Sequence, residues 1–289
     1  MKYRLKVADL IFDIDSFPDE TTERMFEPYM TEDTSETHLS IVCTMTDTKI
    51  KEPDSTKLTE REEVNWYSSG DGCYSICFYD FINGIICARI DYDNNRKKAD
   101  VSVYDVKKHL GIDAGAVLCN VLERVFRLAL VFNGGFVMHA SSIVHDGYGM
   151  AFSAESGTGK STHTGLWMKV YPGTYILNDD APALRKLDGT WYIYGTPWAG
   201  STGINANTSV PLKSAVFLER SEVNKIRPCS ALEGIKRLFE AIIHPVSDEL
   251  VNITLSAVSD FIATAQLCVL GCNMTDDAPR TVREYLFDK

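Results

Sequence analysis

Alternating apolar and polar positions run through the first 110 residues of the chain. Segments rich in Ile, Val, Tyr and Phe recur at short intervals, and several place apolar side chains at every second position. This period of two is typical of half-buried antiparallel strands. The predicted strands are Leu5–Asp15, His38–Asp47, Cys73–Phe81, Ile85–Tyr92 and Ala99–Val106. The Asn83-Gly84 dipeptide between two of them is a hairpin signal. Residues 1–110 are therefore expected to form a small, mostly-β N-terminal domain.

A long apolar helix is predicted directly after this region. Asp113 has a side chain suited to an N-cap, and the segment from Ala114 to Phe132 is apolar on nearly all sides. Asn133-Gly134-Gly135 ends it, because glycine accepts the backbone angles found at a helix C-terminus. Charged residues within the segment argue against a membrane span. A helix of this kind is expected to be buried between layers or domains.

Strands and helices are interleaved in the rest of the chain. The predicted strands are Phe136–Val144, Gly149–Phe152, Tyr175–Leu177, Ala183–Leu187, Trp191–Tyr194, Ser214–Glu219 and Leu267–Gly271. The predicted helices are Ser161–Val170, Ala231–Ile242, Ala257–Ala265 and Ala278–Phe287. This mixture indicates an α/β fold, with an α+β mixed sheet, for a second domain over residues 111–289.

The composition is that of a soluble globular protein, with 45% hydrophobic and 24% charged residues. A net charge of −11 argues against a non-specific nucleic-acid or anionic-membrane surface, so neither is expected as a partner. The first residues are neither long enough nor apolar enough in pattern for a signal peptide. The eight cysteines form no CxxC pair and are interpreted as reduced thiols, which favours a cytoplasmic location.

An acidic stretch interrupts the predicted strands near the N-terminus. The stretch from Asp13 to Glu36 contains nine carboxylates and a single basic residue, Arg24. Such a run is typical of a solvated loop. A role in docking a substrate is the alternative that the sequence leaves open.

Residues Ala154–Thr162 have the pattern of a phosphate-binding P-loop, with Ala154 in place of the usual first glycine. An apolar run precedes the segment and a predicted helix follows it, which is the strand–loop–helix setting of this motif. Gly157 and Gly159 can turn successive N–H groups toward one anion, and Lys160 can reach the outer phosphates. The predicted nucleotide-binding residues are Glu155, Ser156, Gly157, Thr158, Gly159, Lys160, Ser161 and Thr162. The Ser161 hydroxyl is expected on Mg²⁺. A Gly-Thr-Gly turn that precedes Lys-Ser by chance is the structural alternative.

A pair of carboxylates follows the next predicted strand, Tyr175–Leu177. Asp179 and Asp180 come directly after this strand, behind Asn178. Acidic residues at a strand end just after the P-loop helix are where a Walker-B type metal site is expected. A turn with two solvated carboxylates is the structural alternative. The Gly- and Ser-rich segment Gly195–Asn205 is either an ordered loop over a ligand or a long connection.

Three of these segments have counterparts in one known family. They are Gly135–Ala140, Ala154–Thr162 and Asn178–Asp180. Together they resemble the HPr kinase/phosphorylase family and its shorter HPr serine kinase C-terminal domain-like relatives, within the phosphoenolpyruvate-carboxykinase-like P-loop fold. The Gly195–Asn205 segment resembles a Gly-Thr-Pro-Trp stretch of HPr-kinase-like proteins. The first 110 residues do not resemble the regulatory domain of true HPr kinases, and the loop after the carboxylates departs from the glycine-rich signature of those bifunctional enzymes. Both departures argue against HPr itself as substrate and against phosphorolysis.

The resemblance implies roles for the two carboxylates and for one histidine. One of Asp179 and Asp180 would hold Mg²⁺, with Asp179 and Ser161 as the expected ligands, and the other would accept the proton of the attacking hydroxyl. His139 precedes the P-loop by two strands, and in this family the matching histidine lies near the carboxylates and tunes them. A core histidine on a strand is the alternative. The expected catalytic residues are Asp180, Asp179, His139 and Lys160.

The sequence thus predicts an ATP-dependent kinase that uses Mg²⁺ and transfers the γ-phosphate to a hydroxyl, expected to be serine in a small protein or peptide. Arg220 or Lys213 would steady the transferring group. A small-molecule kinase, for free serine or another metabolite, would use the same site. A nucleotide-binding regulator without turnover is a further alternative. A true carboxykinase is not expected, because the chain is short for that group and has no oxaloacetate-binding arginine cluster. The sequence is also compatible with a homo-oligomer.

Overall fold

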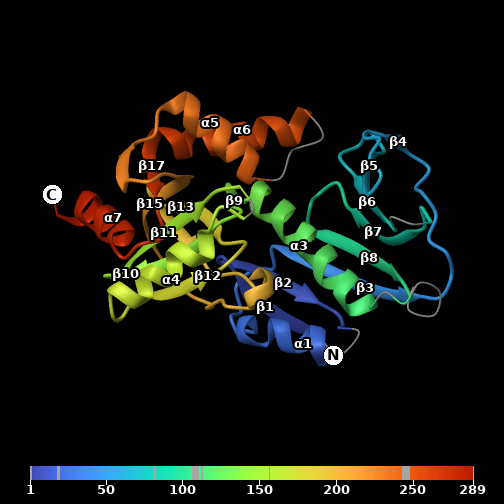
Figure 1. Cartoon of the computed structure of the whole chain (residues 1–289). Helices are drawn as coiled ribbons and strands as arrows, with labels where there is room; N and C mark the ends of the chain where they lie inside the picture. Colours follow the sequence, from blue (N-terminus) through green and yellow to red (C-terminus); the bar gives the residue numbers. More distant parts are fainter. Residues whose placement is uncertain are drawn as a thin grey trace. The chain divides into compact units, whose positions relative to one another are not determined.

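The computed structural model describes residues 2–17, 20–80, 83–105, 111, 113–155, 157–242 and 248–288. The chain forms two compact units, which are drawn together in Figure 1. The first comprises Met1–Leu130 with Val246–Asp248, and the second comprises Val131–Pro245 and Glu249–Lys289. Each unit is built around its own sheet.

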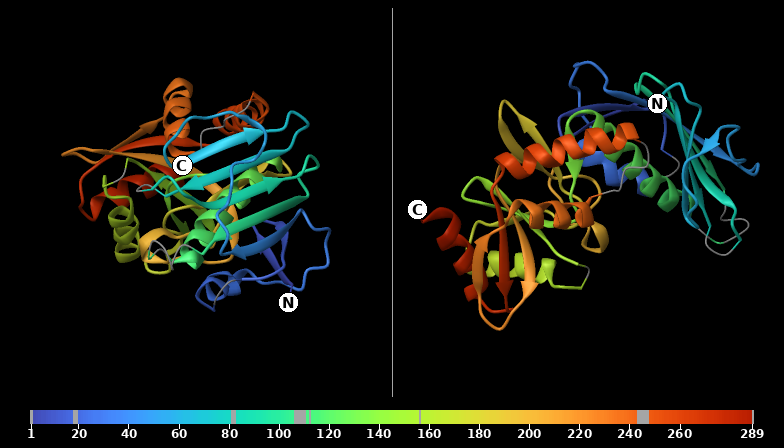
Figure 2. Two further views of the ribbon diagram at one scale, coloured as in Figure 1. Left: turned by 90° about the vertical axis from the view of Figure 1, so that its right-hand side faces the viewer. Right: turned by 90° about the horizontal axis from the view of Figure 1, so that it is seen from above.

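The first unit contains an eight-stranded sheet in the order β1-β2-β3-β8-β7-β6-β5-β4, seen in Figure 2. Its strands are β1 (Tyr3–Val7), β2 (Leu10–Ile14), β3 (Leu39–Thr46), β4 (Thr56–Lys57), β5 (Val64–Ser68), β6 (Tyr74–Tyr79), β7 (Ile86–Tyr92) and β8 (Lys98–Tyr104). The predicted single strand Leu5–Asp15 is wrong, because Ala8 and Asp9 take positive φ angles of 51° and 58° and fold it into the β1–β2 hairpin. The mostly-β character of the N-terminal region is confirmed.

Part of the acidic stretch is structured in the first unit. It contains α1 (Glu20–Phe26) and the 3₁₀ helix η1 (Glu27–Tyr29). Two of its carboxylates pair with cations of β1: Arg4 with Asp13 at 3.3 Å, and Lys6 with Asp33 at 3.1 Å. These carboxylates are therefore bound within the unit, unlike those of a fully solvated loop.

The long helix α3 (Ala114–Phe132) packs on the first sheet. The hydroxyl of Tyr92 on β7 donates to the backbone oxygen of Val125 at 2.8 Å, and the Phe12 and Phe126 rings lie 5.8 Å apart. The compact units divide after Leu130, in the last turn of this helix, whereas the sequence placed a boundary at residue 110. Among the described residues no helix has the length and apolar character needed to cross a membrane.

The second unit contains a mixed sheet in the order β12-β10-β11-β15-β14-β13-β9, with β17 beside β15 and β16 beside β17. Its strands are β9 (Gly135–Val137), β10 (Ser141–His145), β11 (Tyr148–Ser153), β12 (Tyr175–Asn178), β13 (Ala183–Leu187), β14 (Thr190–Tyr194), β15 (Ser209–Arg220), β16 (Lys225–Pro228) and β17 (Leu267–Cys272). The β11–β15 and β15–β17 pairs are parallel and the other pairs are antiparallel. The predicted mixed α/β fold class is confirmed.

Two layers of helices cover the second sheet. They are α4 (Lys160–Val170) and α7 (Asp277–Phe287) on one face, and α5 (Ala231–Ala241) and α6 (Asp248–Thr264) on the other (Figure 1). Adjacent residues of β11 point to opposite faces: Ala151 packs in the cluster that contains Phe261 of α6, and Phe152 packs with Trp167 of α4. A strand buried on both faces loses the period of two, which explains the continuous apolar run before the P-loop.

The predicted strand Phe136–Val144 is also wrong, because the structure splits it. β9 pairs with β13, whereas β10 pairs with β11 and β12. Between them, the N–H of His139 donates to the Ala241 oxygen at 2.8 Å, and the N–H of Ala140 donates to the Asp180 oxygen at 3.0 Å. The break therefore places His139 beside the segment that carries Asp180.

Candidate active site

The P-loop motif connects β11 to α4. β11 ends at Ser153 and α4 begins at Lys160. Gly157 and Gly159 have φ angles of 76° and 107°, a region that residues with a Cβ rarely adopt. Ser156 lies outside the described residues. The loop thus has the strand–loop–helix setting and the glycine conformations that direct backbone N–H groups toward an anion.

The first turn of α4 is open to solvent. Ser161 and Thr162 are exposed, and the Gly159 N-cap position has no side chain to bond to the helix N–H groups. Because the N–H groups of a first helical turn have no acceptor within the helix, they can bind an anion, and the helix dipole favours negative charge there. Glu155 and Thr158 complete the described part of the loop, exposed and half-buried respectively.

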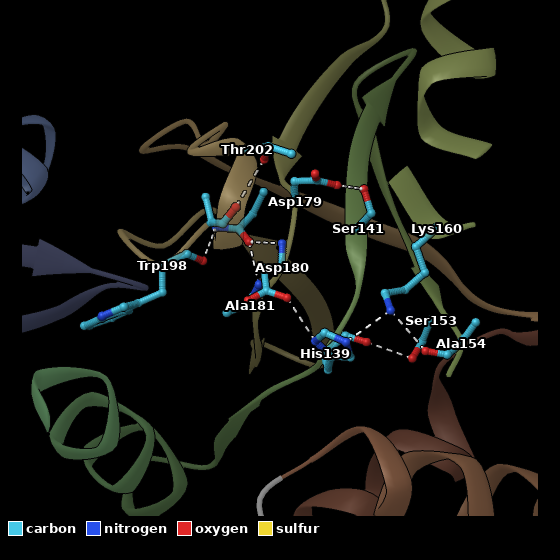
Figure 3. A network of polar contacts seen from close by, with 12 residues as sticks. His139, Ser141, Ser153, Ala154, Lys160, Asp179, Asp180, Ala181, Trp198 and Thr202 are labelled. Carbon is cyan, nitrogen blue, oxygen red and sulfur yellow. Dashed lines mark hydrogen bonds and ion pairs between the residues drawn. The ribbon is translucent and has the colours of Figure 1, made fainter. Parts of the chain in front are cut away.

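A chain of polar contacts joins the P-loop to the carboxylate pair (Figure 3). Nζ of Lys160 lies 3.1 Å from Nε2 of His139 and 3.1 Å from the oxygen of Ala154. Nδ1 of His139 lies 3.0 Å from Oδ1 of Asp180. Since an ammonium can only donate, Nε2 accepts from Lys160 and the imidazole donates from Nδ1 to Asp180. This arrangement places the imidazole between a cation and an anion.

The backbone around His139 fixes its position. Ser153, the last residue of β11, donates from its hydroxyl to the His139 oxygen at 2.8 Å. His139 stands in the break between β9 and β10, and its side chain is 47% exposed. The alternative of a core histidine within a strand is therefore wrong.

Asp179 and Asp180 lie in different environments. Asp179 is only 7% exposed, and its Oδ1 accepts from the Ser141 hydroxyl at 2.5 Å. Because the Ser141 proton goes to Asp179, the Ser141 oxygen accepts from the hydroxyl of Thr164 on α4 at 2.9 Å, and this hydroxyl lies 3.1 Å from the Ser161 oxygen. The side chain of Asp180 is 37% exposed. A buried hydrogen-bonded chain thus links Asp179 to the first turn of the P-loop helix.

Asn178 fixes the turn that carries the two carboxylates. Its Oδ1 accepts from the N–H groups of Asp180 at 3.0 Å and Ala181 at 2.7 Å. Its Nδ2 donates to the oxygens of Thr196 at 2.9 Å and Trp198 at 3.2 Å. Asn178 is fully buried, so one side chain joins the carboxylate turn to the Gly- and Ser-rich loop.

That loop, residues 195–205, lies directly against Asp180. Gly200 takes a φ of 59°, and a Cβ built on it would lie 3.0 Å from Cβ and 3.3 Å from Oδ2 of Asp180. The Asp179 N–H also donates to the Ile204 oxygen at 3.2 Å. The segment is thus an ordered loop held beside the carboxylates.

Burial lowers the pKa of the Lys160 ammonium, while the charges of Asp180 and then Asp179 raise it. Burial is the larger effect, so the pKa of Lys160 lies below its usual value, and the two carboxylates offset only part of that shift. A positive charge close to the N-terminus of α4 adds to the field that attracts an anion.

The structure separates the two cations predicted to steady a phosphoryl group. Nη2 of Arg220, at the end of β15, donates to the Gly157 oxygen at 2.9 Å. Nζ of Lys213, seven residues earlier on β15, lies over the Tyr148 and Phe287 rings at 5.3 and 4.8 Å. Seven residues of strand span about 23 Å. Only Arg220 therefore lies at the P-loop.

A polar cavity of about 1070 Å³ opens beside the loop. We call it the polar cavity, and its lining includes His139, Glu155, Thr158, Arg220, Lys236 and Glu240. Further along α5, Arg237 pairs with Glu233 at 3.0 Å and with Glu219. Charged groups of both signs thus face the space next to His139.

The sequence analysis assigned no role to three residues that hold this site together. Ser141, Thr164 and Asn178 are all fully buried and all bond to the carboxylate turn or to one another. A polar residue at a core-facing position is a signal for such a role, but its partner cannot be inferred without the order of the strands.

Comparisons with known proteins give limited similarity. No family model matches the chain, and no curated protein matches it. A solved structure of the HPr(Ser) kinase/phosphatase from Coxiella burnetii is similar to part of it, with 12% identity and a TM-score of 0.32. The match covers 52% of this chain and 95% of that structure. At this TM-score the similarity does not assign a family.

Proposed function

We propose that the chain is an ATP-dependent phosphotransferase that transfers the γ-phosphoryl group to a hydroxyl. One observation carries the proposal: the P-loop ammonium of Lys160 contacts His139, which contacts Asp180. Phosphoryl transfer requires positive charge around the phosphates and a carboxylate within reach of the attacking hydroxyl. Here the Lys160 ammonium and the Asp180 carboxylate are joined through His139 by one continuous set of contacts.

The phosphates would bind at the first turn of α4. Its free N–H groups, the loop amides near Gly157 and Gly159, and the Lys160 ammonium would replace water around the β- and γ-phosphates. Lys160 would exchange its contacts with Ala154 and His139 for phosphate oxygens. Arg220 lies at the same loop and would balance charge on the transferring group.

The described residues fit Mg²⁺ only together with a nucleotide. No group of three or more His, Cys, Asp or Glu side chains among the described residues could hold a metal alone. Mg²⁺ usually takes one or two carboxylates, and its other ligands are phosphate oxygens and water. Asp179 and the Ser161 hydroxyl are the oxygen donors we propose. When bound, the ion would neutralise charge on the phosphates.

Asp180 is the general base in this proposal. It is more exposed than Asp179, and the Nδ1–H of His139 holds one of its oxygens in place. The acceptor oxygen forms a bond to the γ-phosphorus while the bond from that phosphorus to the leaving oxygen of ADP breaks. The leaving oxygen keeps the electron pair, and the hydroxyl proton passes to Asp180.

The polar cavity is the space we propose for the acceptor. Small-molecule pockets are lined mainly by apolar groups. Here Arg220, Lys236, Glu155 and Glu240 line the cavity beside His139. Such a lining favours a charged, hydrophilic acceptor, and we propose a serine hydroxyl in a small protein or peptide.

The test is transfer of label from [γ-³²P]ATP in the presence of Mg²⁺. The wild-type chain would be incubated with arrayed serine-containing peptides, with protein extracts and with free serine. Label in peptide or protein supports the proposal, and label in free serine alone would establish the small-molecule alternative. ATP binding without transfer to any acceptor or to water would instead indicate a nucleotide-binding regulator.

A further inference from the structure

A second space borders the P-loop, and His139 is not part of its lining. We call it the Met274 groove; it has a volume of about 700 Å³, and Gly159, Cys272 and Met274 form part of its lining. Met274 stands in the turn between β17 and α7. The groove shares only Thr158 and Arg220 with the polar cavity, so two spaces with different linings meet at the P-loop.

Met274 lies against the backbone of the P-loop. The methyl carbon of its side chain occupies the place where a Cβ on Gly159 would stand, so only glycine allows the contact. The side chain nevertheless remains 45% exposed. An exposed thioether fixed on a phosphate-binding loop leaves an apolar, polarizable surface facing the groove.

The turn that carries Met274 is fixed by its neighbours. The N–H of Asn273 donates to Oδ1 of Asn224 at 3.0 Å, and Nδ2 of Asn224 donates back to Oδ1 of Asn273 at 2.9 Å. Nδ2 of Asn273 donates to the Glu222 oxygen at 2.9 Å. The backbone position of Met274 is therefore set before any ligand binds, which lowers the entropy cost of binding.

The two spaces differ from each other in the same way as the two ends of a nucleotide. The polar cavity holds several charged side chains of α5, whereas the Met274 groove combines a thioether, a buried cysteine and glycine backbone with Arg220, Glu222 and small polar side chains. A nucleoside triphosphate likewise has a charged end that carries the transferring group and an uncharged aromatic end.

From this match we propose that the Met274 groove binds the nucleoside of the triphosphate, with the base against the Met274 thioether. Arg220, which lines both spaces, would stand where the phosphates pass from one to the other. The rim carboxylate of Glu222 would accept hydrogen bonds from the ribose hydroxyls. This inference rests on the proposed function, because it takes the P-loop as the phosphate site.

Calorimetric titrations of the full chain with Mg²⁺-ATP and with Mg²⁺-tripolyphosphate, which has no nucleoside, test the assignment. Contacts between sulfur and an aromatic ring contribute about 0.3–1.5 kcal/mol, so Met274→Ala should weaken ATP binding about two- to tenfold. Tripolyphosphate binding should not change. Met274→Leu, which keeps an apolar surface, should recover part of the affinity. Met168→Ala is the matched control, because Met168 on α4 is 39% exposed and lies outside the groove lining.

Two results would overturn the assignment. If Met274→Ala binds ATP as tightly as the wild type, the nucleoside does not lie in the groove. If the variant loses ATP and tripolyphosphate equally, Met274 supports the loop and does not contact a base. Failure of the phosphate site on which this inference rests looks different, because the wild-type chain would then bind neither ligand, whereas a chain that binds ATP without transferring phosphate would overturn the proposed function and leave the assignment of the groove testable.

Discussion

The hydroxyl of Ser141 donates to Oδ1 of Asp179 at 2.5 Å, with both side chains buried. The same hydroxyl group lies 2.9 Å from the hydroxyl of Thr164 on the P-loop helix. Two side chains outside the loop motif therefore tie the carboxylate turn to α4. If Asp179 binds Mg²⁺ as we propose, Ser141 sets the direction of its carboxylate and acts as a positioning residue.

We expect Ser141→Ala to lower phosphotransfer about 10- to 100-fold, the usual effect of losing a group that orients a metal ligand. The Mg²⁺ concentration needed for half-maximal activity should rise as well. The measurement is a Mg²⁺ titration of the transfer rate. Ser214→Ala is a matched control, because Ser214 is fully buried and donates to the Gln266 oxygen at 2.9 Å, away from the carboxylate turn. An unchanged Mg²⁺ requirement in Ser141→Ala would contradict the positioning role.

The parts of the fold that follow local rules were predictable from the sequence. The P-loop setting, the strand before it and the carboxylates after the next strand depend on residues close together in the chain. The contact between Ser141 and Asp179 depends instead on β12 lying beside β10. Strand order is decided by the packing of the whole unit, so no local pattern reveals that pair.

The break around His139 was not predictable for the same reason. Met138-His139-Ala140 contains no glycine or proline that would end a strand. The chain leaves the sheet there because Ala241 and Asp180, distant in sequence, accept its backbone N–H groups. The position of α3 also depends on a partner far away in sequence, Tyr92.

Lys160→Ala should weaken ATP binding about 10- to 100-fold, since hydrogen bonds to a charged group contribute about 1.5–3 kcal/mol. Phosphotransfer should be lost with it. Titration calorimetry with Mg²⁺-ATP gives the affinity. Lys169→Ala on the same helix is the control: Lys169 is 65% exposed, and its ion pair with Asp276 is of the surface kind that contributes little. An ATP affinity unchanged by Lys160→Ala would remove the P-loop from the proposal.

Asp180→Asn should preserve ATP affinity and lower phosphotransfer by about 10²–10⁴, the range attributed to a general base. The amide oxygen can still accept from Nδ1 of His139, so the side-chain geometry is kept while the basicity is lost. Single-turnover transfer under saturating ATP separates binding from chemistry. Asp188→Asn is the control, because Asp188 is an exposed turn residue with a φ of 46° and asparagine tolerates this conformation. Full activity in Asp180→Asn would exclude this carboxylate as the base.

Stability should fall between pH 6.5 and 4 because of His163, which is fully buried on α4. Burial lowers the pKa of His163 from 6.5 to about 4, and its Nε2 accepts from the Trp167 indole at 3.2 Å. The unfolded chain therefore takes up a proton at a higher pH than the folded chain. The stabilisation is complete above pH 6.5 and is lost as the pH falls toward 4, by on the order of 3 kcal/mol.

Urea unfolding at pH 7 and pH 5 measures this dependence. His163→Gln offers Trp167 an acceptor that does not titrate, so the variant should lose less stability than the wild type over this interval. Part of the pH dependence of the unfolding free energy should remain in the variant, because burial also lowers the pKa of His145. Equal losses of unfolding free energy between pH 7 and pH 5 in the wild type and the variant would show that the pKa of His163 does not change on folding.

Gly200→Ala tests the contact between the loop and Asp180, and Gly203 in the same loop provides a matched control. The two glycines have φ angles of 59° and 65°, so an alanine at either should cost about 1–2 kcal/mol in backbone strain. They differ in surroundings: a Cβ at Gly200 would press on the Asp180 side chain, whereas one at Gly203 would meet nothing within 4 Å. We therefore expect similar losses of unfolding free energy and a loss of phosphotransfer in Gly200→Ala alone. Equal activities in the two variants would show that the loop does not set the position of Asp180.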